Sequence, residues 1–323
     1  MRFNVPRTIL LLSLMITPAL WAQNDFDLNV ALMQSTFMLR GPDARGGTSI
    51  GTGFILFRPL PGAKLDAPNV TGKLVLVTAA HVFDEMVGDE AVILVRVHSV
   101  NSTLWSVVPA RMKIREHGRP LWKNHPTADV AVVYVTPPIA GNELVIPFEE
   151  RNVVPTTLLA DDDLLKKNVV NPGLELKCLG YPLGSASNAA GFPVLRTGVI
   201  ASYPLLPTAE TKTFLFDFRV FKGNSGGPVY FSQSLPKGGT VLGGVPQFIM
   251  GLVSKEANFT TTVTDLYETR QTTYPLSIGE VVFASLIKEA IASLPSPETP
   301  EAAAGVVRIE VLPQGPPTTI NRR

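Results

Sequence analysis

Cysteine is nearly absent from this chain. Its 323 residues include one cysteine, Cys178, which excludes an internal disulfide bond. A chain of this length can bury enough apolar surface to fold without one. Cys178 alternates with Leu174 and Leu176 in an apolar run, so the three side chains share one side of a predicted strand. We therefore interpret Cys178 as a buried packing residue rather than a nucleophile.

An excess of either charge is also absent. The chain has 28 Lys and Arg against 27 Asp and Glu, a formal net charge of +1. Nucleic-acid-binding domains carry a clear basic excess, so we expect no nucleic-acid partner. With 45% hydrophobic and 17% charged residues, the composition predicts a packed core rather than a disordered chain.

Candidate metal ligands are scarce as well. The chain has four histidines, and its compact acidic cluster comprises residues 161–163. Such a cluster could bind a cation, but no further oxygen ligands follow it at a suitable spacing, so a solvated turn is the better interpretation. We expect no metal and no cofactor.

The apolar run near the N-terminus, residues 9–16, is too short to span a membrane comfortably. Arg2 and Arg7 lie before it, and small residues lead up to Ala22 after it. This order predicts a signal peptide over residues 1–22, and an uncleaved anchor is the alternative. We expect an exported protein, periplasmic or secreted, with no stable membrane insertion after cleavage.

Short runs rich in Val, Ile, Phe and Thr, separated by Gly, Pro and Asn, fill most of the remaining chain. Many short strands with turn residues between them are typical of a β-sandwich or barrel. The runs comprise residues 31–39, 49–57, 73–78, 91–97, 104–108 and 129–135 in the first half, and 174–179, 193–202, 213–221, 229–231 and 247–254 in the second.

Helical spacing replaces this pattern near the end of the chain. Apolar residues recur at intervals of three and four from Phe283 to Leu294, which predicts one amphipathic helix. Ser277 and Glu280 precede the run with the spacing of a capping box. One helix is therefore expected to close a β-rich protein.

Three further segments are predicted to connect or flank the strands. Residues 58–71 are rich in Pro, Gly, Asp and Asn and predict an exposed hairpin loop. Residues 136–155 lack strong periodicity and could join two halves. Residues 295–323 shift to Pro, Ala, Glu and Thr, which predicts a mobile tail, although residues 306–311 could form a short strand.

The most informative stretch is Lys-Gly-Asn-Ser-Gly-Gly-Pro at residues 222–228. Glycines allow a tight bend and a close approach of a substrate to the main chain. A serine in such a bend, with bare N–H groups beside it, suits acyl transfer, which needs a nucleophile and donors for a developing oxyanion. The same residues are also common in surface turns, so this stretch alone leaves both interpretations open.

A serine nucleophile needs a base and an orienting acid. His81 is the best candidate base because an apolar strand runs into the small residues Thr78-Ala79-Ala80 before it. Asp129 is the best candidate acid because it directly precedes the apolar run at residues 130–135. A core histidine and an ordinary turn aspartate are the alternatives for these two positions.

Together these stretches resemble the catalytic blocks of the trypsin-like (chymotrypsin-fold) serine peptidases. The blocks are Thr-Ala-Ala-His at 78–81, Asp-Val-Ala-Val at 129–132 and Gly-Asn-Ser-Gly-Gly-Pro at 223–228, in the family's order. The resemblance implies an all-β fold of two packed six-stranded antiparallel β-barrels with a C-terminal helix. It implies a first barrel over residues 23–145 and a second, with the helix, over 146–294, followed by the tail at 295–323.

Other residues resemble the bacterial HtrA/Deg branch of this family. They are Gly-Thr-Gly-Phe-Ile at 51–55, Leu-Gly-Tyr-Pro-Leu-Gly at 179–184 and Thr-Gly-Val-Ile-Ala-Ser at 197–202. The segment after the helix is too short for a PDZ domain. We therefore expect a single-domain relative rather than a regulated HtrA-type oligomer, and the sequence assigns no oligomeric state.

The resemblance implies a role for each matched residue. Ser225 would attack the carbonyl of a polypeptide substrate, His81 would act as base and then acid, and Asp129 would orient His81. The N–H groups of Gly223 and Ser225 would form the oxyanion hole. The strand Gly251-Leu252-Val253-Ser254 would line the specificity pocket and pair with the substrate backbone.

Specificity is less well determined. Arg219 precedes Ser225 by six residues, where the family often places the base of the primary pocket. It could favour an acidic substrate side chain, but the better interpretation is that it points to solvent or pairs with Asp217.

Two alternatives to an exported serine endopeptidase stay open. The fold could serve as a catalytically silent or chaperone-like peptide-binding module, although the presence of all three triad residues argues against this. An esterase could use the same serine. An α/β-hydrolase is disfavoured, because residues 223–227 do not follow its Gly-x-Ser-x-Gly pattern and the triad order differs.

Overall fold

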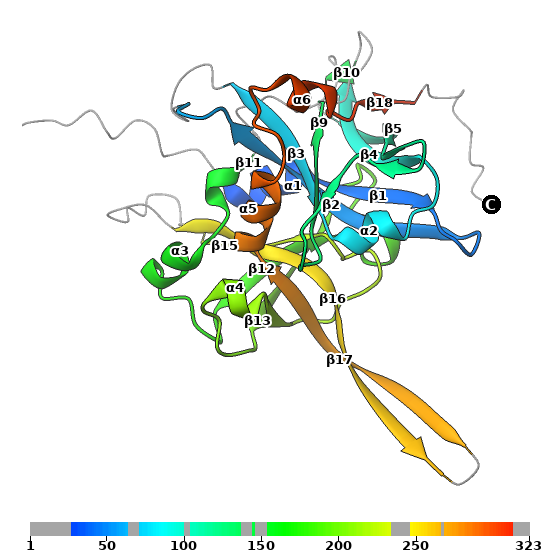
Figure 1. Cartoon of the computed structure of the whole chain (residues 1–323), viewed down its shortest axis with the longest axis vertical. Helices are drawn as coiled ribbons and strands as arrows, with labels where there is room; N and C mark the ends of the chain where they lie inside the picture. The colour runs from blue at the N-terminus through cyan, green and yellow to red at the C-terminus, as the bar shows by residue number, and fades with distance from the viewer. Residues whose placement is uncertain are drawn as a thin grey trace, which may run out of the picture.

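Strands dominate the structure, a computed structural model that describes residues 27–63, 71–99, 104–136, 144–145, 154–233, 246–265 and 268–312. They form two units that pack against each other, as expected from the sequence (Figure 1). The predicted signal peptide at residues 1–22 lies outside the described residues. Among those residues, no helix has the length and apolarity needed to cross a membrane.

The first unit is a curled sheet in which neighbouring strands run β18-β5-β4-β1-β2-β3-β9-β8, with β10 paired to β4 and β11 to β2. β2 and β3 form the predicted hairpin, since Pro59 pairs with Gly72. Residues 64–70 of the loop predicted at 58–71 lie outside the described residues. The strands are β1 (Thr36–Pro42), β2 (Thr48–Pro59), β3 (Gly72–Thr78), β4 (Glu90–Ser99), β5 (Trp105–Lys113), β8 (Lys123–Asn124), β9 (Ala131–Val135), β10 (Leu144–Val145), β11 (Val154–Pro155) and β18 (Ile309–Val311). The short pair β6 (Arg115–Glu116) and β7 (Arg119–Pro120) forms a separate ribbon.

The second unit is a closed six-stranded barrel in the order β12-β13-β14-β17-β16-β15. Its strands are β12 (Glu175–Gly180), β13 (Val194–Ile200), β14 (Thr213–Asp217), β15 (Pro228–Ser232), β16 (Gln247–Thr264) and β17 (Thr269–Phe283). Short helices occupy the connections and flanks of both units: α1 (Leu28–Ser35), α2 (Ala80–Asp84), η1 (Thr156–Leu158), α3 (Asp162–Lys167), η2 (Pro182–Gly184), α4 (Thr208–Thr211) and α6 (Pro300–Ala304). The result is the two-barrel fold that the sequence predicts.

The first unit differs from a closed six-stranded barrel because β5 and β9 do not pair with each other. The C-terminal segment fills this place instead. Val307 bridges Val135 of β9, and its N–H donates to the carbonyl of Tyr134 at 2.8 Å. β18 then pairs antiparallel with β5. The expected short strand within residues 306–311 therefore exists, and this part of the predicted mobile tail bonds to both ends of the sheet.

The closing helix is confirmed as α5 (Ala284–Ala292), which buries Leu286, Ile287 and Ala290. The predicted capping box in front of it is wrong. Ser277 and Glu280 lie in β17, which continues to Phe283, and no side chain caps the helix. Glu280 pairs with both β14 and β16, and Ser277 lies at an irregularity of β17 with φ +58°, so the helix begins only where the pairing of β17 ends.

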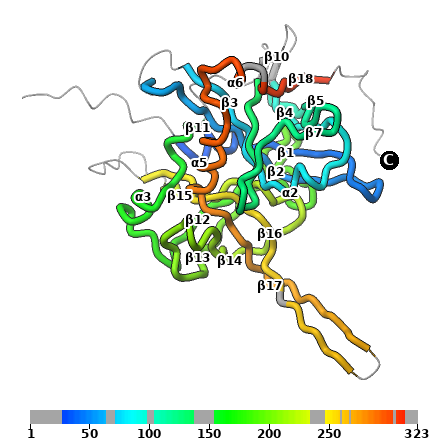
Figure 2. The backbone as a smooth tube through the Cα atoms, viewed as in Figure 1, coloured from blue at the N-terminus to red at the C-terminus, as the bar shows by residue number. Residues whose placement is uncertain are grey.

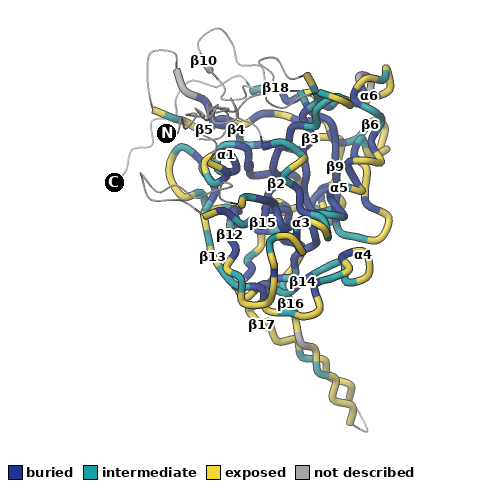
Figure 3. Tube along the Cα trace, turned by 90° about the vertical axis from the view of Figure 1, so that its left-hand side faces the viewer, coloured by how far each residue is buried: buried dark blue, intermediate teal, exposed yellow. Residues whose placement is uncertain are grey.

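β16 and β17 continue beyond the barrel as a long two-stranded arm, which Figure 1 and Figure 2 show projecting from the body. Its register runs from Glu256 opposite Gly279 to Thr264 opposite Thr269. Threonines are frequent in both strands and favour extended backbone. Buried residues concentrate in the two barrels, whereas the arm is largely exposed (Figure 3).

Arg96 joins the two barrels in the core. It comes from β4 and is 1% exposed. Its guanidinium donates to the hydroxyl of Tyr181 at 3.1 Å and to the carbonyls of Gly191 and Gln34 at 3.3 and 2.5 Å. It also lies over the ring of Phe37, 4.5 Å from the ring centroid. Neutral oxygens and an aromatic face thus satisfy a buried cation at the interface of the barrels.

Candidate active site

His81 lies in the short helix α2, directly after the buried end of β3. The side chains of Thr78 and Ala79 are fully buried, so the small residues noted in the sequence allow the helix to start tightly against the sheet. The Thr78 hydroxyl donates to the carbonyl of Thr52 at 2.7 Å and fixes this corner to β2. The imidazole itself is partly exposed, with 35% of its side-chain surface accessible.

The structure brings Asp129 and His81 together, 48 residues apart in the chain. His81 Nδ1 lies 2.7 Å from Asp129 Oδ2, and the His81 backbone N–H donates to Oδ1 at 3.0 Å. The hydroxyl of Ser254 donates to Oδ2 at 2.6 Å. Asp129 precedes β9, which is paired with β3, so one sheet edge delivers both residues. Three donors hold the carboxylate in place, and it in turn fixes the imidazole.

These contacts change the pKa of both groups. Burial raises the pKa of Asp129, but the hydrogen bond and charge of His81 and the hydroxyl of Ser254 outweigh it and lower the pKa to about 2. Burial lowers the pKa of His81, but the hydrogen bond and charge of Asp129, with the charges of Glu85 and Asp84, outweigh it and raise the pKa above 6.5. The acid is therefore ionised at neutral pH and stabilises a protonated imidazole.

Ser225 lies in a loop clamped between the two barrels. Its carbonyl accepts from the N–H of Thr52 on β2 at 2.8 Å, and the N–H of Gly226 donates to the carbonyl of Val253 on β16 at 2.7 Å. Gly226 has φ +84°, and a side chain there would collide with the Thr52 carbonyl and the Thr78 hydroxyl. The loop thus abuts the corner where α2 begins, which explains why glycine follows the serine.

Two carbonyls of this loop are held so that the N–H groups of the same peptides point the other way. The Lys222 carbonyl accepts from the N–H of Leu183 at 2.7 Å, and the Asn224 carbonyl accepts from that of Gly227 at 2.9 Å. In a trans peptide, C=O and N–H are opposed. The N–H groups of Gly223 and Ser225 therefore face away from these contacts, and neither has an acceptor within the described part of the chain.

The predicted pocket residues lie in different surroundings. Gly251 and Leu252 belong to the barrel wall, where β16 pairs with β15 and β17. The N–H and carbonyl of Val253 bond to Gly227 and Gly226 of the serine loop, so neither group faces a substrate. Ser254 is the member of this strand that reaches the site, through its hydroxyl.

Arg219 is exposed, and its guanidinium carbon lies 5.0 Å from the ring centroid of Phe221. The Arg219 carbonyl accepts from Arg196, whose guanidinium lies over Phe218. Between Arg219 and Asp217, both described residues, there is no ion pair. The solvent-facing arrangement favoured from the sequence is the one observed.

Sequence reasoning missed two contributors to the site. The η2 residue Leu183 holds the Lys222 carbonyl and has φ +53°, which is unusual for leucine. Thr52 donates through Oγ1 to the Gly223 carbonyl at 2.6 Å and through its N–H to Ser225. Both lie in stretches with a family resemblance, but their partners are backbone carbonyls, which leave no residue-specific signal in the sequence. The partnership of Ser254 with Asp129 also went unassigned.

Other reactive residues lie outside this constellation. His125 is buried, with Nε2 3.1 Å from Glu289 of α5, and His117 occupies the tight turn between β6 and β7. The side chain of His98 lies outside the described residues. Cys178 is buried as predicted, and burial raises the pKa of its thiol to about 12, which makes it a poor nucleophile.

The acidic residues 161–163 form the start of helix α3 rather than a cation site. Asp161 caps the helix through the N–H of Leu164 and pairs with Lys288 at 2.5 Å. Asp162 accepts from the hydroxyl of Thr208 at 2.6 Å. Within the described residues, no group of three or more His, Cys, Asp or Glu side chains could hold a metal ion.

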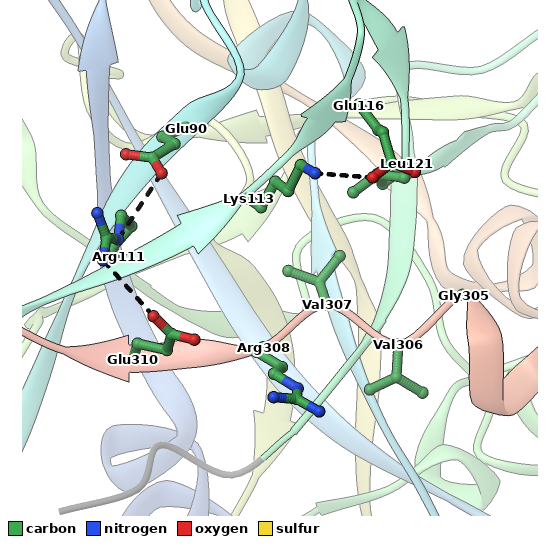
Figure 4. Close-up of a pocket in the computed structure, with 10 residues that line it drawn as sticks. All are labelled: Glu90, Arg111, Lys113, Glu116, Leu121, Gly305, Val306, Val307, Arg308 and Glu310. Carbon is green, nitrogen blue, oxygen red and sulfur yellow. Dashed lines mark hydrogen bonds and ion pairs between the residues drawn. The ribbon is translucent and has the colours of Figure 1, made fainter.

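A separate hollow of about 510 Å³ lies where the C-terminal segment meets the first sheet (Figure 4). Most of its charged side chains are paired: Arg111 lies 3.7 Å from Glu90 and 3.6 Å from Glu310, and Lys113 lies 2.8 Å from Glu116. Arg308 also lines the hollow and has no ion pair within the described residues. No histidine, serine or cysteine lines it. This hollow is a seam between the tail strand and β5, not a second reaction centre.

Two features define the class of the protein. The first sheet brings His81 and Asp129 together, and the second barrel carries a glycine-rich loop with a serine. Over residues 51–235, more than half of its length, the chain matches the trypsin-like peptidase domain. The chain belongs to this family of serine peptidases. No curated protein sequence matches it.

Proposed function

We propose that this protein is an exported serine endopeptidase that hydrolyses peptide bonds of polypeptide substrates through an acyl-enzyme. The observation that carries the proposal is the contact of His81 Nδ1 with Asp129 Oδ2 at 2.7 Å, beside a loop that leaves the N–H groups of Gly223 and Ser225 without acceptors. The family membership gives the general class, and this geometry supports turnover over passive binding.

In the proposed reaction, the Ser225 hydroxyl attacks the scissile carbonyl while Nε2 of His81 takes its proton. Asp129 keeps the other ring proton on Nδ1 and stabilises the imidazolium. The oxyanion that forms accepts from the N–H groups of Gly223 and Ser225. His81 then gives its proton to the leaving amine, and water, activated by the same imidazole, releases the acyl group from Ser225.

A fluorophosphonate probe tests the nucleophile directly. We expect wild-type protein to be labelled covalently and Ser225→Ala protein to remain unlabelled. Ser187→Ala is a matched control, because Ser187 lies in an exposed connection of the second barrel, where its hydroxyl and its backbone N–H both donate to the Phe192 carbonyl. Labelling that persists in Ser225→Ala, or that never occurs in folded wild type, contradicts the proposal.

The same experiment distinguishes the other two functions. A silent peptide-binding module would bind unfolded polypeptide without being labelled. An esterase would be labelled but would leave casein intact while hydrolysing small esters. We expect casein digestion by the wild type and none by Ser225→Ala.

We further propose export and kinship with the HtrA/Deg branch. Arg2, Arg7 and the apolar run at residues 9–16 support export, and N-terminal sequencing of the mature protein should begin directly after Ala22. The residues at 51–55 and 179–184 support the branch, because both stretches flank the serine loop: Thr52 and Leu183 each bond to it.

A further inference from the structure

The turn that carries Asp129 is short and connects β8 to β9 through residues 125–130. Asp129 is the central residue of a three-residue turn within it, because the Val130 N–H donates to the Ala128 carbonyl at 2.8 Å. Residues 126 and 127 are exposed. Burial therefore contributes little to the shape of this part of the turn, and hydrogen bonds must define where the acid points.

His125 begins this turn and supplies two of its hydrogen bonds. Its backbone N–H donates to the Val130 carbonyl at 2.8 Å, and its Nδ1 accepts from the Thr127 N–H at 3.2 Å. A backbone N–H can only donate, so Nδ1 carries no proton and the ring proton lies on Nε2. Nε2 donates in turn to the Glu289 carboxylate of α5 at 3.1 Å. The imidazole is 5% exposed, so these partners replace water around it.

The two ring nitrogens of His125 therefore have different partners. Nε2 anchors the imidazole to α5 through Glu289, whose side chain is 58% exposed. Nδ1 bonds to the N–H two positions further along the chain, as the side chain of Asp or Asn does in an Asx-turn. That bond is made before Asp129 in the chain, and the bond from the His125 N–H to Val130 is made directly after it. The two contacts bracket the acid, so a change in the turn would move its carboxylate relative to His81.

We propose that His125 is a positioning residue for the triad acid. By accepting from the Thr127 N–H, its Nδ1 holds the turn in the conformation that brings Asp129 to His81. The contact between His81 Nδ1 and Asp129 Oδ2 is 2.7 Å long, and an error of about 1 Å in the placement of a catalytic group can slow a reaction on the order of 100-fold. His125 acts through Asp129 and takes no proton from Ser225. This inference rests on the proposed endopeptidase function and adds a second histidine to its site.

Asparagine and glutamine at position 125 separate the two ring nitrogens. The Asn oxygen can accept from the Thr127 N–H and so replaces Nδ1, whereas the Gln amide lies one bond further out and replaces the Nε2 donor. We expect fluorophosphonate to label His125→Asn within about threefold of the wild-type rate, and His125→Gln about 10- to 100-fold more slowly. The pH midpoint of labelling should fall in His125→Gln alone, because a displaced Asp129 raises the pKa of His81 less. A residue that only anchors the turn to α5 would give the opposite order of rates.

Three further variants serve as controls, each checked for its fold by circular dichroism. Glu289→Ala removes the anchor on α5 but leaves Nδ1 in place, so it should label within about threefold of the wild-type rate. His117→Asn makes the same exchange in the exposed turn between β6 and β7, where asparagine tolerates the positive φ of +50°, and should leave the rate unchanged. His125→Ala lacks the acceptor as well and should be as slow as His125→Gln, which it replaces if that variant folds poorly.

The outcomes that would overturn the inference are distinct from those that would contradict the proposed function. Folded His125→Gln that labels at the wild-type rate, or His125→Asn that is as slow as His125→Gln, overturns the role of Nδ1. An equal loss in Glu289→Ala overturns it too, because the anchor would then account for the effect. No labelling of Ser225 in the wild type contradicts the proposed function, whereas labelling at one common rate in all variants contradicts only the role of His125.

Discussion

Replacing Asp129 with asparagine tests how the site controls the protons of His81. In the wild type, three donors converge on the carboxylate: His81 Nδ1 at 2.7 Å, the His81 backbone N–H at 3.0 Å and the Ser254 hydroxyl at 2.6 Å. Asparagine keeps one acceptor oxygen and presents an NH2 group in place of the other. That NH2 group must face either the backbone N–H or the pair formed by Nδ1 and Ser254.

Either orientation impairs the base. If NH2 faces Nδ1, His81 accepts there and carries its proton on Nε2, the nitrogen that has to take the proton of Ser225. If NH2 faces the backbone N–H, two donors oppose each other, and a charge-assisted hydrogen bond of about 1.5–3 kcal/mol is lost. In both cases the imidazolium loses its counter-charge. We expect Ser225 to react about 10³- to 10⁴-fold more slowly, the loss typical of a triad with the wrong tautomer.

The assay is the second-order rate constant for fluorophosphonate labelling between pH 5 and 9, with circular dichroism to check the fold. In the wild type the rate should rise with a midpoint above pH 6.5, because Asp129 raises the pKa of His81. In Asp129→Asn the midpoint should fall, since burial of His81 remains and the raising charge is gone. Asp84→Asn, a nearby acid without a hydrogen bond to His81, should change the rate less than about threefold. A folded Asp129→Asn protein within tenfold of the wild-type rate would refute the reasoning.

Three further outcomes concern stability. The pKa of Asp129 is about 2 instead of the ordinary 3.8, so its carboxylate should contribute roughly 2 kcal/mol to the unfolding free energy above pH 4, and this contribution is lost as the pH falls toward 2. In urea titrations, the unfolding free energy of Asp129→Asn should therefore fall less between pH 4 and pH 2 than that of the wild type. Arg96→Met should lower the unfolding free energy by about 2–4 kcal/mol, because it leaves buried carbonyls without donors. Arg111 is exposed, so Arg111→Met should lower it by less than about 1 kcal/mol, and equal effects of the two variants in thermal melts would contradict this expectation. Val307→Pro removes the hydrogen bond to the Tyr134 carbonyl and should lower the melting temperature by several degrees, and an unchanged melt would show that the C-terminal segment does not stabilise the first sheet.

Much of the fold could be predicted because strand pattern and catalytic motifs are local properties. The apolar runs that contain β2, β3, β9 and β12 have the length and composition of strands, and the closing helix shows clear 3.6-residue spacing. Local context alone indicated His81 as a base and Asp129 as its orienting acid, and the family resemblance then supported their pairing. The spacing of apolar residues therefore indicates which face of a strand or helix is buried, whereas the family resemblance indicates which strands lie next to each other.

The remaining features depend on long-range pairing. The junction of β18 with β5 joins residues about 200 positions apart, and a three-residue strand has too little pattern to reveal its partner. Ser277 and Glu280 match a helix cap by spacing, but Glu280 pairs with β14 and β16, and Ser277 lies at an irregularity of the same strand. Glu256 has a buried carboxylate oxygen without a hydrogen-bond partner among the described residues, and this could not be predicted because it depends on what packs around the side chain.

The position of β18 in the chain has a consequence for how the protein is made. Synthesis proceeds from the N-terminus, so the edges of β5 and β9 emerge long before residues 307–311 exist, while the whole second barrel has still to be completed. Exposed strand edges recruit other chains, and contacts between distant residues form late in folding. The nascent first barrel therefore carries an open seam until the second barrel has been synthesised, and the segment that protects the seam from aggregation follows only then.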